Sequence, residues 1–154
     1  MLHEVSDEIP TPFESAQLNL KLFELRREPV LREARAWVTR EFHPQSFEDV
    51  TAELQGKHST WLRMVYGYWD MAASLVTTGA IDPEAFRAAH TEISATFCKM
   101  QPFLTQLRTT MGVPELFRHI EIVVMGAPDA EATMERMRTR LRASAQARAA
   151  KAQA

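Results

Sequence analysis

The sequence has little glycine and almost no cysteine. Only 5 of its 154 residues are glycine, against 21 alanines. Neither a G-x-G-x-x-G nor a Walker sequence occurs, so the phosphate loops that need several glycines are excluded. The single cysteine, Cys98, has no partner for an intrachain disulfide or a C-x-x-C site. Its apolar neighbours favour a buried, inert thiol, and we expect a reducing, cytoplasmic location.

Long hydrophobic runs are also absent. The longest, from Ile122 to Ala127, is far shorter than the roughly 18 residues of a membrane span. The first residues, MLHEVSDEIPTPF, carry acids and two prolines where a signal peptide has bases and an apolar run. The sequence therefore predicts no membrane contact.

Motifs for metal or nucleophilic chemistry are missing as well. There is no H-E-x-x-H, no Cys/His ligand spacing and no nucleophile elbow. We therefore expect no metal, no cofactor and no catalytic residue, and an enzyme is the less favoured class. With 18 Lys and Arg against 20 Asp and Glu, the formal net charge is -2, which excludes a strongly basic nucleic-acid binder.

The chain does contain many residues that typically begin or end helices. Helices are expected over 13–27, 29–42, 46–56, 59–78, 83–112 with a kink or break at Pro102, 114–126, and from 128 onward. Ser46 with Asp49 and Asp82 with Pro83 have the pattern of helix N-termini. Residues 120–124 are β-branched enough for a strand, but Pro114 and Gly126 frame a helix-length window. The fold predicted is a single-domain, all-α bundle of six to seven helices.

The segment at about 60–78 is the most hydrophobic of these helices. Two apolar rows run along it and leave only a narrow polar row: Arg63, Gly67, Asp70, Ser74 and Thr77. A helix that is apolar around most of its circumference is normally central in its bundle. We therefore expect the other helices to pack around it.

Four residues are candidates for a binding site. Arg35 falls within the apolar face of its helix, where a cation needs a partner; Asp70 or Glu24 could be that partner, or an anionic ligand could be. Tyr66, Trp69 and Asp70 form an aromatic segment with one acid, and the intervening Gly67 suggests that something approaches the backbone closely there. The competing interpretations are structural: an interhelix ion pair or a stem that extends to solvent for Arg35, packing against a neighbouring helix for the aromatic segment, and solvation or a surface pair for Asp70.

Charge is unevenly distributed along the chain. Residues 1–28 hold six acids and three bases, whereas residues 136–154 hold six bases and no acid. We divide the chain into an irregular arm at 1–12, a helical bundle at 13–142, and an alanine-rich basic extension at 143–154. The bases surround the last helix and no aromatic residue lies between them, so we do not expect nucleic acid as the main partner.

Three segments together resemble a known family: SAQLNLKLFELRREPVLREARAW, WLRMVYGYWDMAASLVTTGAIDPEAF and PELFRHIEIVV. They are similar to small helical bacterial proteins classed only as a domain of unknown function, over most of residues 15–124. The resemblance implies a helical fold and no established activity. Similar sequences often carry an amino-terminal membrane anchor, and we expect none in this chain. If the family shares a site, Arg35, Tyr66, Trp69 and Asp70 are its expected residues.

Three functions remain open at this stage. The leading hypothesis is a non-catalytic helical interaction or accessory module that binds a protein partner or itself. The second is a small-molecule or anion-binding protein, or an enzyme, that uses Arg35 and the segment Tyr66–Asp70. The third is weak nucleic-acid contact through the basic final helix.

Overall fold

The computed structural model describes residues 9–154, and within this range the chain is built from helices alone. Nine α-helices are present, and a short 3₁₀ turn, η1, joins two of them. Their bounds are α1 Pro12–Leu25, α2 Pro29–Arg40, α3 Phe47–Gln55, α4 Ser59–Thr77, α5 Pro83–Ala89, α6 Glu92–Met100, η1 Gln101–Phe103, α7 Leu104–Met111, α8 Arg118–Met125 and α9 Ala130–Ala152. The all-α, single-domain prediction is confirmed, with more and shorter helices than the six to seven expected.

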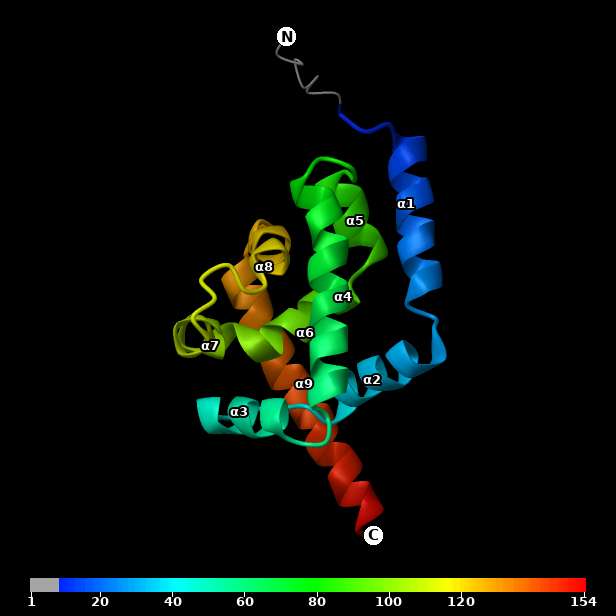
Figure 1. Cartoon of the computed structure of the whole chain (residues 1–154). Helices are drawn as coiled ribbons and strands as arrows, with labels where there is room; N and C mark the ends of the chain where they lie inside the picture. The colour runs from blue at the N-terminus through cyan, green and yellow to red at the C-terminus, as the bar shows by residue number, and fades with distance from the viewer. Residues whose placement is uncertain (1–8) are drawn as a thin grey trace.

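The hydrophobic helix predicted at about 60–78 is α4, and it lies in the middle of the bundle (Figure 1). Eight of its 19 residues are buried. Helices α2, α3 and α8 pack against it. This arrangement follows from its sequence, because a helix that is apolar on most sides must be covered on most sides.

Helix ends follow the local signals in the sequence. The Ser46 hydroxyl accepts from the Asp49 N–H, and the Asp49 carboxylate accepts from the Ser46 N–H, which makes a complete capping box for α3. Asp82 caps α5 with a single bond, because its carboxylate accepts from the Ala85 N–H at 2.8 Å. Gly79 has a left-handed backbone, with φ of 86°, which lets the chain turn sharply between α4 and α5.

The helix expected over 83–112 is divided at His90 as well as at Pro102. His90 leaves helical geometry, with φ of -126° and ψ of 63°, and its ring is fully buried. The break turns this ring toward Phe86, whose ring centroid is 4.8 Å away. Pro102 lies in η1, as the expected kink requires. A buried polar ring thus divides a helix that the apolar spacing alone predicts to be continuous.

The segment after Pro114 forms a turn where a helix start is predicted. Phe117 adopts a left-handed backbone, with φ of 55°, and α8 begins only at Arg118. Residues 120–124 lie within α8, so the helical interpretation of these β-branched residues is confirmed.

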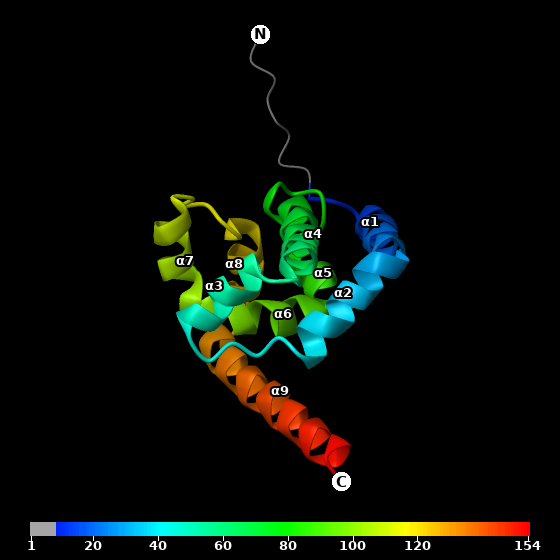
Figure 2. The same ribbon diagram turned by 60° about the horizontal axis from the view of Figure 1, so that its bottom comes forward.

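The final helix, α9, crosses the outside of the bundle and continues beyond it (Figure 2). Its contacts are with α6, α2 and α8. Met134 is buried and Met137 and Leu141 are half-buried, whereas every residue from Gln146 onward is exposed. The helix is continuous across the predicted boundary between residues 142 and 143.

Candidate functional site

Arg35 is part of an ion-pair cluster that joins three helices. Its Nε and Nη2 donate to the two carboxylate oxygens of Glu92 in α6, at 2.7 and 2.5 Å. Its Nη1 donates to the carbonyl of Arg26, the C-cap of α1, at 3.0 Å. The expected partners, Asp70 and Glu24, are therefore wrong, and the partner is an acid 57 residues away in the sequence. A guanidinium held in this two-pronged way is already occupied.

Tyr66 and Trp69 are both fully buried. The Tyr66 hydroxyl donates to the carbonyl of Thr96 at 2.7 Å, and burial raises the pKa of Tyr66 well above its ordinary value. The indole N–H of Trp69 has no hydrogen-bond partner among the described residues. Its ring lies edge-on to that of His90, with the centroids 5.9 Å apart.

Asp70 caps a neighbouring helix. Its Oδ1 accepts a hydrogen bond from the backbone N–H of Ile120, in the first turn of α8, at 3.1 Å. A carboxylate in this position meets the positive end of the helix dipole and satisfies one of its free N–H groups. A second contact between α4 and α8 is the 2.6 Å distance between Thr77 Oγ1 and His119 Nδ1.

The four candidate residues therefore have four separate sets of partners. Only Tyr66 lines a cavity, a mostly apolar one of about 230 Å³ between α3, α4, α7 and the turn at Leu116–Phe117. Gly67 lies on the same cavity. A Cβ added at Gly67 would meet no atom within 4 Å, so the expected close approach to its backbone is wrong, and open space is found instead.

Lys99 is a functional candidate that the sequence did not suggest. It is only 4% exposed, yet its ammonium donates to the carbonyls of Val38 and Thr39 in the last turn of α2. Burial lowers the pKa of Lys99 to about 8. A cation at a helix C-terminus is stabilised by the helix dipole and by the free carbonyls there.

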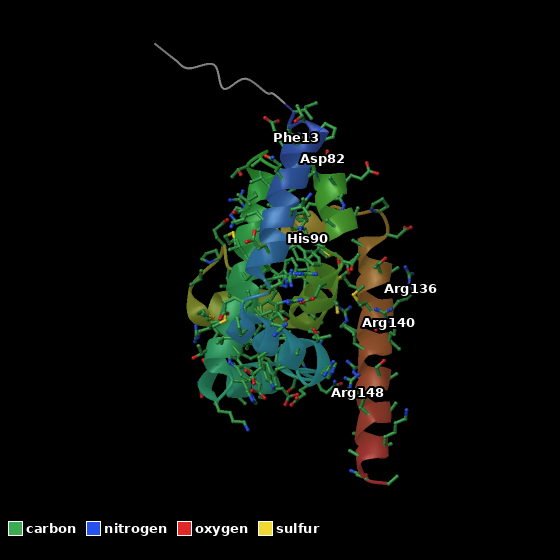
Figure 3. The ribbon with its side chains drawn as sticks, turned by 90° about the vertical axis from the view of Figure 1, so that its right-hand side faces the viewer. Phe13, Asp82, His90, Arg136, Arg140 and Arg148 are labelled. Atoms are coloured by element: carbon green, nitrogen blue, oxygen red, sulfur yellow. The ribbon has the colours of Figure 1, made fainter. Side chains whose placement is uncertain are left out.

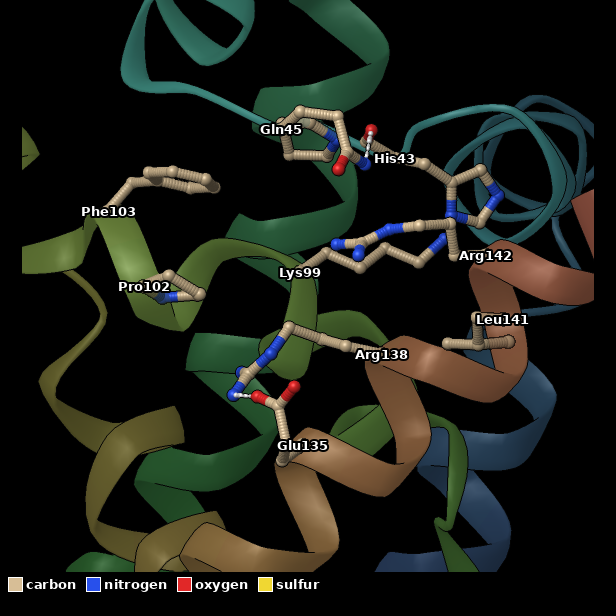
Figure 4. Close-up of a pocket in the computed structure, with 10 residues that line it drawn as sticks. His43, Gln45, Lys99, Pro102, Phe103, Glu135, Arg138, Leu141 and Arg142 are labelled. Carbon is tan, nitrogen blue, oxygen red and sulfur yellow. Dashed lines mark hydrogen bonds and ion pairs between the residues drawn. The ribbon is translucent and has the colours of Figure 1, made fainter.

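Lys99 also lines a second cavity of about 230 Å³, enclosed by α9, η1 and the loop after α2 (Figure 4). We call it the cationic pocket. Three further basic side chains line it, and Glu135 is the one carboxylate among its lining residues: His43, Pro44, Gln45, Lys99, Pro102, Phe103, Glu135, Arg138, Leu141 and Arg142.

The outer side of α1 is a surface of a different kind. Phe13 and Leu20 are 69% and 72% exposed, and Phe23 is 43% exposed. Phe13, Ala16, Leu20 and Phe23 recur at spacings of three and four residues, so they lie along one side of the helix. We call this side, defined by these four residues, the outer α1 face; Phe13 marks its upper end in Figure 3.

Within residues 9–154, no group of three or more His, Cys, Asp or Glu side chains is placed to hold a metal ion. No helix in this range is both long and apolar enough to cross a membrane. No curated protein and no solved structure matches the chain. Residues 12–126, well over half of the chain, match the family described as "Domain of unknown function (DUF4760)". The chain belongs to this DUF4760 family, which covers α1 to α8 and ends before α9.

Proposed function

We propose that this chain is a non-catalytic interaction module that pairs with a second copy of itself through the outer α1 face. The observation that carries this proposal is the exposure of Phe13 and Leu20, at 69% and 72%. Isolated exposed apolar residues are ordinary, but a continuous stripe along one helix is typical of a contact surface. The two copies would associate in a reducing cytoplasm.

The way in which α1 is attached supports this proposal. Its buried side chains are Ser15, Asn19 and Leu22, two of which are polar. Ser15 Oγ accepts from the Asp82 N–H at 3.1 Å, and the carbonyl of Leu22 accepts from the Tyr68 hydroxyl. Helix α1 thus faces the bundle with Ser15 and Asn19 as well as with Leu22, and it leaves Phe13 and Leu20 exposed on its other side.

An antiparallel pair of α1 helices fits the order of residues on the outer α1 face. A two-fold axis near residue 18 places Phe13 opposite Phe23 of the second copy, and Ala16 opposite Leu20. The small Ala16 then leaves room for the larger Leu20. Such an isologous contact closes on itself and makes a dimer.

Charge on the flank of α1 is complementary in the same arrangement. Glu14 and Lys21 lie seven residues apart on one flank of α1, where Glu14 accepts from Thr11 and Lys21 pairs with Glu24. The axis that pairs Phe13 with Phe23 brings Lys21 near Glu14 of the second copy as well. The two-fold axis generates this opposite-charge pair twice. Exposed pairs of this kind add little affinity, but they favour one orientation over the other.

Sedimentation equilibrium at tens of micromolar tests the proposal. We expect the wild-type protein to reach the mass of a dimer and Leu20→Ser to remain a monomer. Met71→Ser is the matched control, because Met71 is an exposed apolar residue on α4; it is expected to dimerise like the wild type. A monomeric wild type, or a Leu20→Ser variant that still dimerises, would contradict the proposal.

The apolar cavity beside Tyr66 and Gly67 favours a second candidate function, the binding of a small apolar molecule. Its lining is dominated by apolar side chains, with one cation, Arg63, among them. The Arg63 guanidinium has only a 3.3 Å contact with Ser59 Oγ, so the ligand class that fits is an apolar body with a carboxylate. Fluorescence titration with octanoate, in the wild type and in Gly67→Leu, tests this candidate; saturable binding that Gly67→Leu abolishes is the expected result.

A further inference from the structure

The cationic pocket has more positive charge than its own acid can neutralise. Glu135 is engaged by Arg138, whose Nη2 donates to it at 2.8 Å. Arg138 also donates through Nη1 to the Cys98 carbonyl at 2.9 Å and to Gln101 Oε1 at 2.7 Å. The Glu135 carboxylate is therefore already paired with Arg138. The charges of Lys99 and Arg142 must be balanced by other groups.

Backbone carbonyls at the end of α2 balance part of the charge of Lys99. The ammonium binds two carbonyls there, and the C-terminus of a helix carries roughly half a negative charge. Arg148 donates to a third carbonyl, that of Arg40, at 2.8 Å. One helix end thus already accepts hydrogen bonds from two cations.

Arg142 is the cation that remains. Among the described residues no carboxylate, carbonyl or hydroxyl accepts a hydrogen bond from it. Arg142 is an exposed residue of α9, and its side chain extends from that helix to line the cationic pocket (Figure 4). Its charge helps to lower the pKa of the Glu135 carboxyl, but the hydrogen bond to that carboxylate comes from Arg138. The guanidinium donors of Arg142 therefore stay available to an anion.

His43 reports the same excess of positive charge on the opposite wall. Its Nε2 lies 3.0 Å from the carbonyl of Arg40. Burial lowers the pKa of His43, and the charges of Lys99, Arg148 and Arg142 lower it further, while the only raising influence is the Arg40 carbonyl. The protonated form is disfavoured because three cations surround the ring without an acid to offset them.

We propose that the cationic pocket binds the phosphate group of a small molecule, with Arg142 as its principal ligand-binding residue. A guanidinium presents paired N–H donors that match phosphate oxygens. Besides the polar Gln45 and Glu135, the rest of the lining is apolar: Pro44, Pro102, Phe103 and Leu141. These apolar groups suit an organic body attached to the phosphate. The volume of about 230 Å³ admits a phosphate with a small ring or chain.

The family segment and helix α9 contribute different walls of the cationic pocket. Arg138, Leu141 and Arg142 come from α9, whereas the family match ends at residue 126. Lys99 and His43 lie within the matched segment. The proposed phosphate site therefore combines residues of the family domain with residues of α9, which lies outside the family match.

Isothermal titration with inorganic phosphate and with phenyl phosphate, at constant ionic strength set by chloride, tests the site. We compare Arg142→Gln with Arg136→Gln, which removes the same charge from another exposed arginine of α9 that does not line the cationic pocket (Figure 3). Saturable binding is expected for the wild type and for Arg136→Gln. The Arg142→Gln variant should bind about tenfold more weakly or worse, because a hydrogen bond to a charged group is lost. Phenyl phosphate should bind more tightly than inorganic phosphate.

Two results would overturn the proposal. One is the absence of saturable binding of either probe to the wild type. The other is equal weakening by Arg142→Gln and Arg136→Gln, which would assign any binding to the general charge of α9. A single-stranded oligonucleotide serves as the third probe. If it binds and both variants weaken it equally, while phenyl phosphate does not bind, the helix attracts polyanions and the pocket has no role.

Discussion

His90 and Asn19 form a buried polar pair that joins the break between α5 and α6 to α1. The distance from His90 Nε2 to Asn19 Oδ1 is 3.1 Å, and the two residues are 0% and 8% exposed. An amide oxygen accepts, so Nε2 carries the proton and Nδ1 is the unprotonated nitrogen. Nδ1 has no partner among the described residues. The neutral ring therefore fits its site, because a second proton on Nδ1 would have no hydrogen-bond acceptor.

This pair predicts a loss of stability in mild acid. Burial, assisted by the charge of Arg26, lowers the pKa of His90 to about 4 from its ordinary value of 6.5. Between these two pH values the unfolded chain binds more protons than the folded one, so the free energy of unfolding falls as the pH drops from 6.5 to 4. We expect a loss of about 1 to 3 kcal/mol in urea denaturation. His90→Gln, which cannot gain this proton, should have a flatter pH dependence; an identical slope would contradict this role.

The ion pair of Arg35 and Glu92 predicts a stability loss when either partner is removed alone. Arg35→Ala leaves Glu92, whose side chain is 23% exposed, without its two-pronged partner. We expect a loss of about 2 to 3 kcal/mol in the free energy of unfolding, near the lower end for a buried pair. Lys21→Ala removes an exposed partner of Glu24 and should cost less than about 1 kcal/mol. Equal losses for the two variants would show that Arg35 adds nothing beyond a surface contact.

Replacing Gly67 with alanine is expected to stabilise the protein. Gly67 lies in the middle of α4, and a Cβ there meets no atom within 4 Å. Gly67→Ala should therefore raise the free energy of unfolding by about 0.5 to 1 kcal/mol, because alanine restricts the unfolded chain and favours the helix. Thermal denaturation checks this, with Gly79→Ala as the contrast. Gly79 has φ of 86°, so alanine there should destabilise the protein. A destabilised Gly67→Ala would mean that the space beside α4 is filled.

Cys98 predicts an unreactive thiol. Burial raises the pKa of Cys98 to about 11, although Lys99 and Arg138 lower it somewhat, and the thiolate is the reactive form. A colorimetric disulfide exchange reagent should therefore release no product from the folded protein at neutral pH and one equivalent after denaturation. Rapid labelling of the folded protein would contradict the burial of this side chain.

Sequence reasoning succeeded where structure depends on neighbouring residues. Patterns within single segments of the chain predict the capping box of Ser46 and Asp49, the turn at Gly79 and the central position of α4. It failed where a partner is distant in the sequence. The partner of Arg35 is Glu92, and Asp70 caps a helix 50 residues away, because only tertiary packing decides which buried polar groups meet.

The cationic pocket was missed for the same reason. His43, Lys99 and Arg142 come from three separate parts of the chain, and each looks ordinary in its own segment. One local signal was present, since Lys99 follows Phe97 and Cys98 and precedes Met100 in an apolar run. A lysine enclosed in this way is rarely buried without a partner. The break at His90 had no comparable signal, because a histidine fits the apolar spacing of a continuous helix.

The central claim, antiparallel pairing of two outer α1 faces, is tested most directly by cross-linking with single cysteines. Cys98 is buried, so a short bismaleimide reports only on an added thiol. The axis near residue 18 predicts that Gln17→Cys cross-links two copies efficiently and that Arg27→Cys, on the same helix but far from the axis, does not. Cross-linking of both variants would mean parallel pairing, and cross-linking of neither would mean that the outer α1 face is unpaired. Either result contradicts the account.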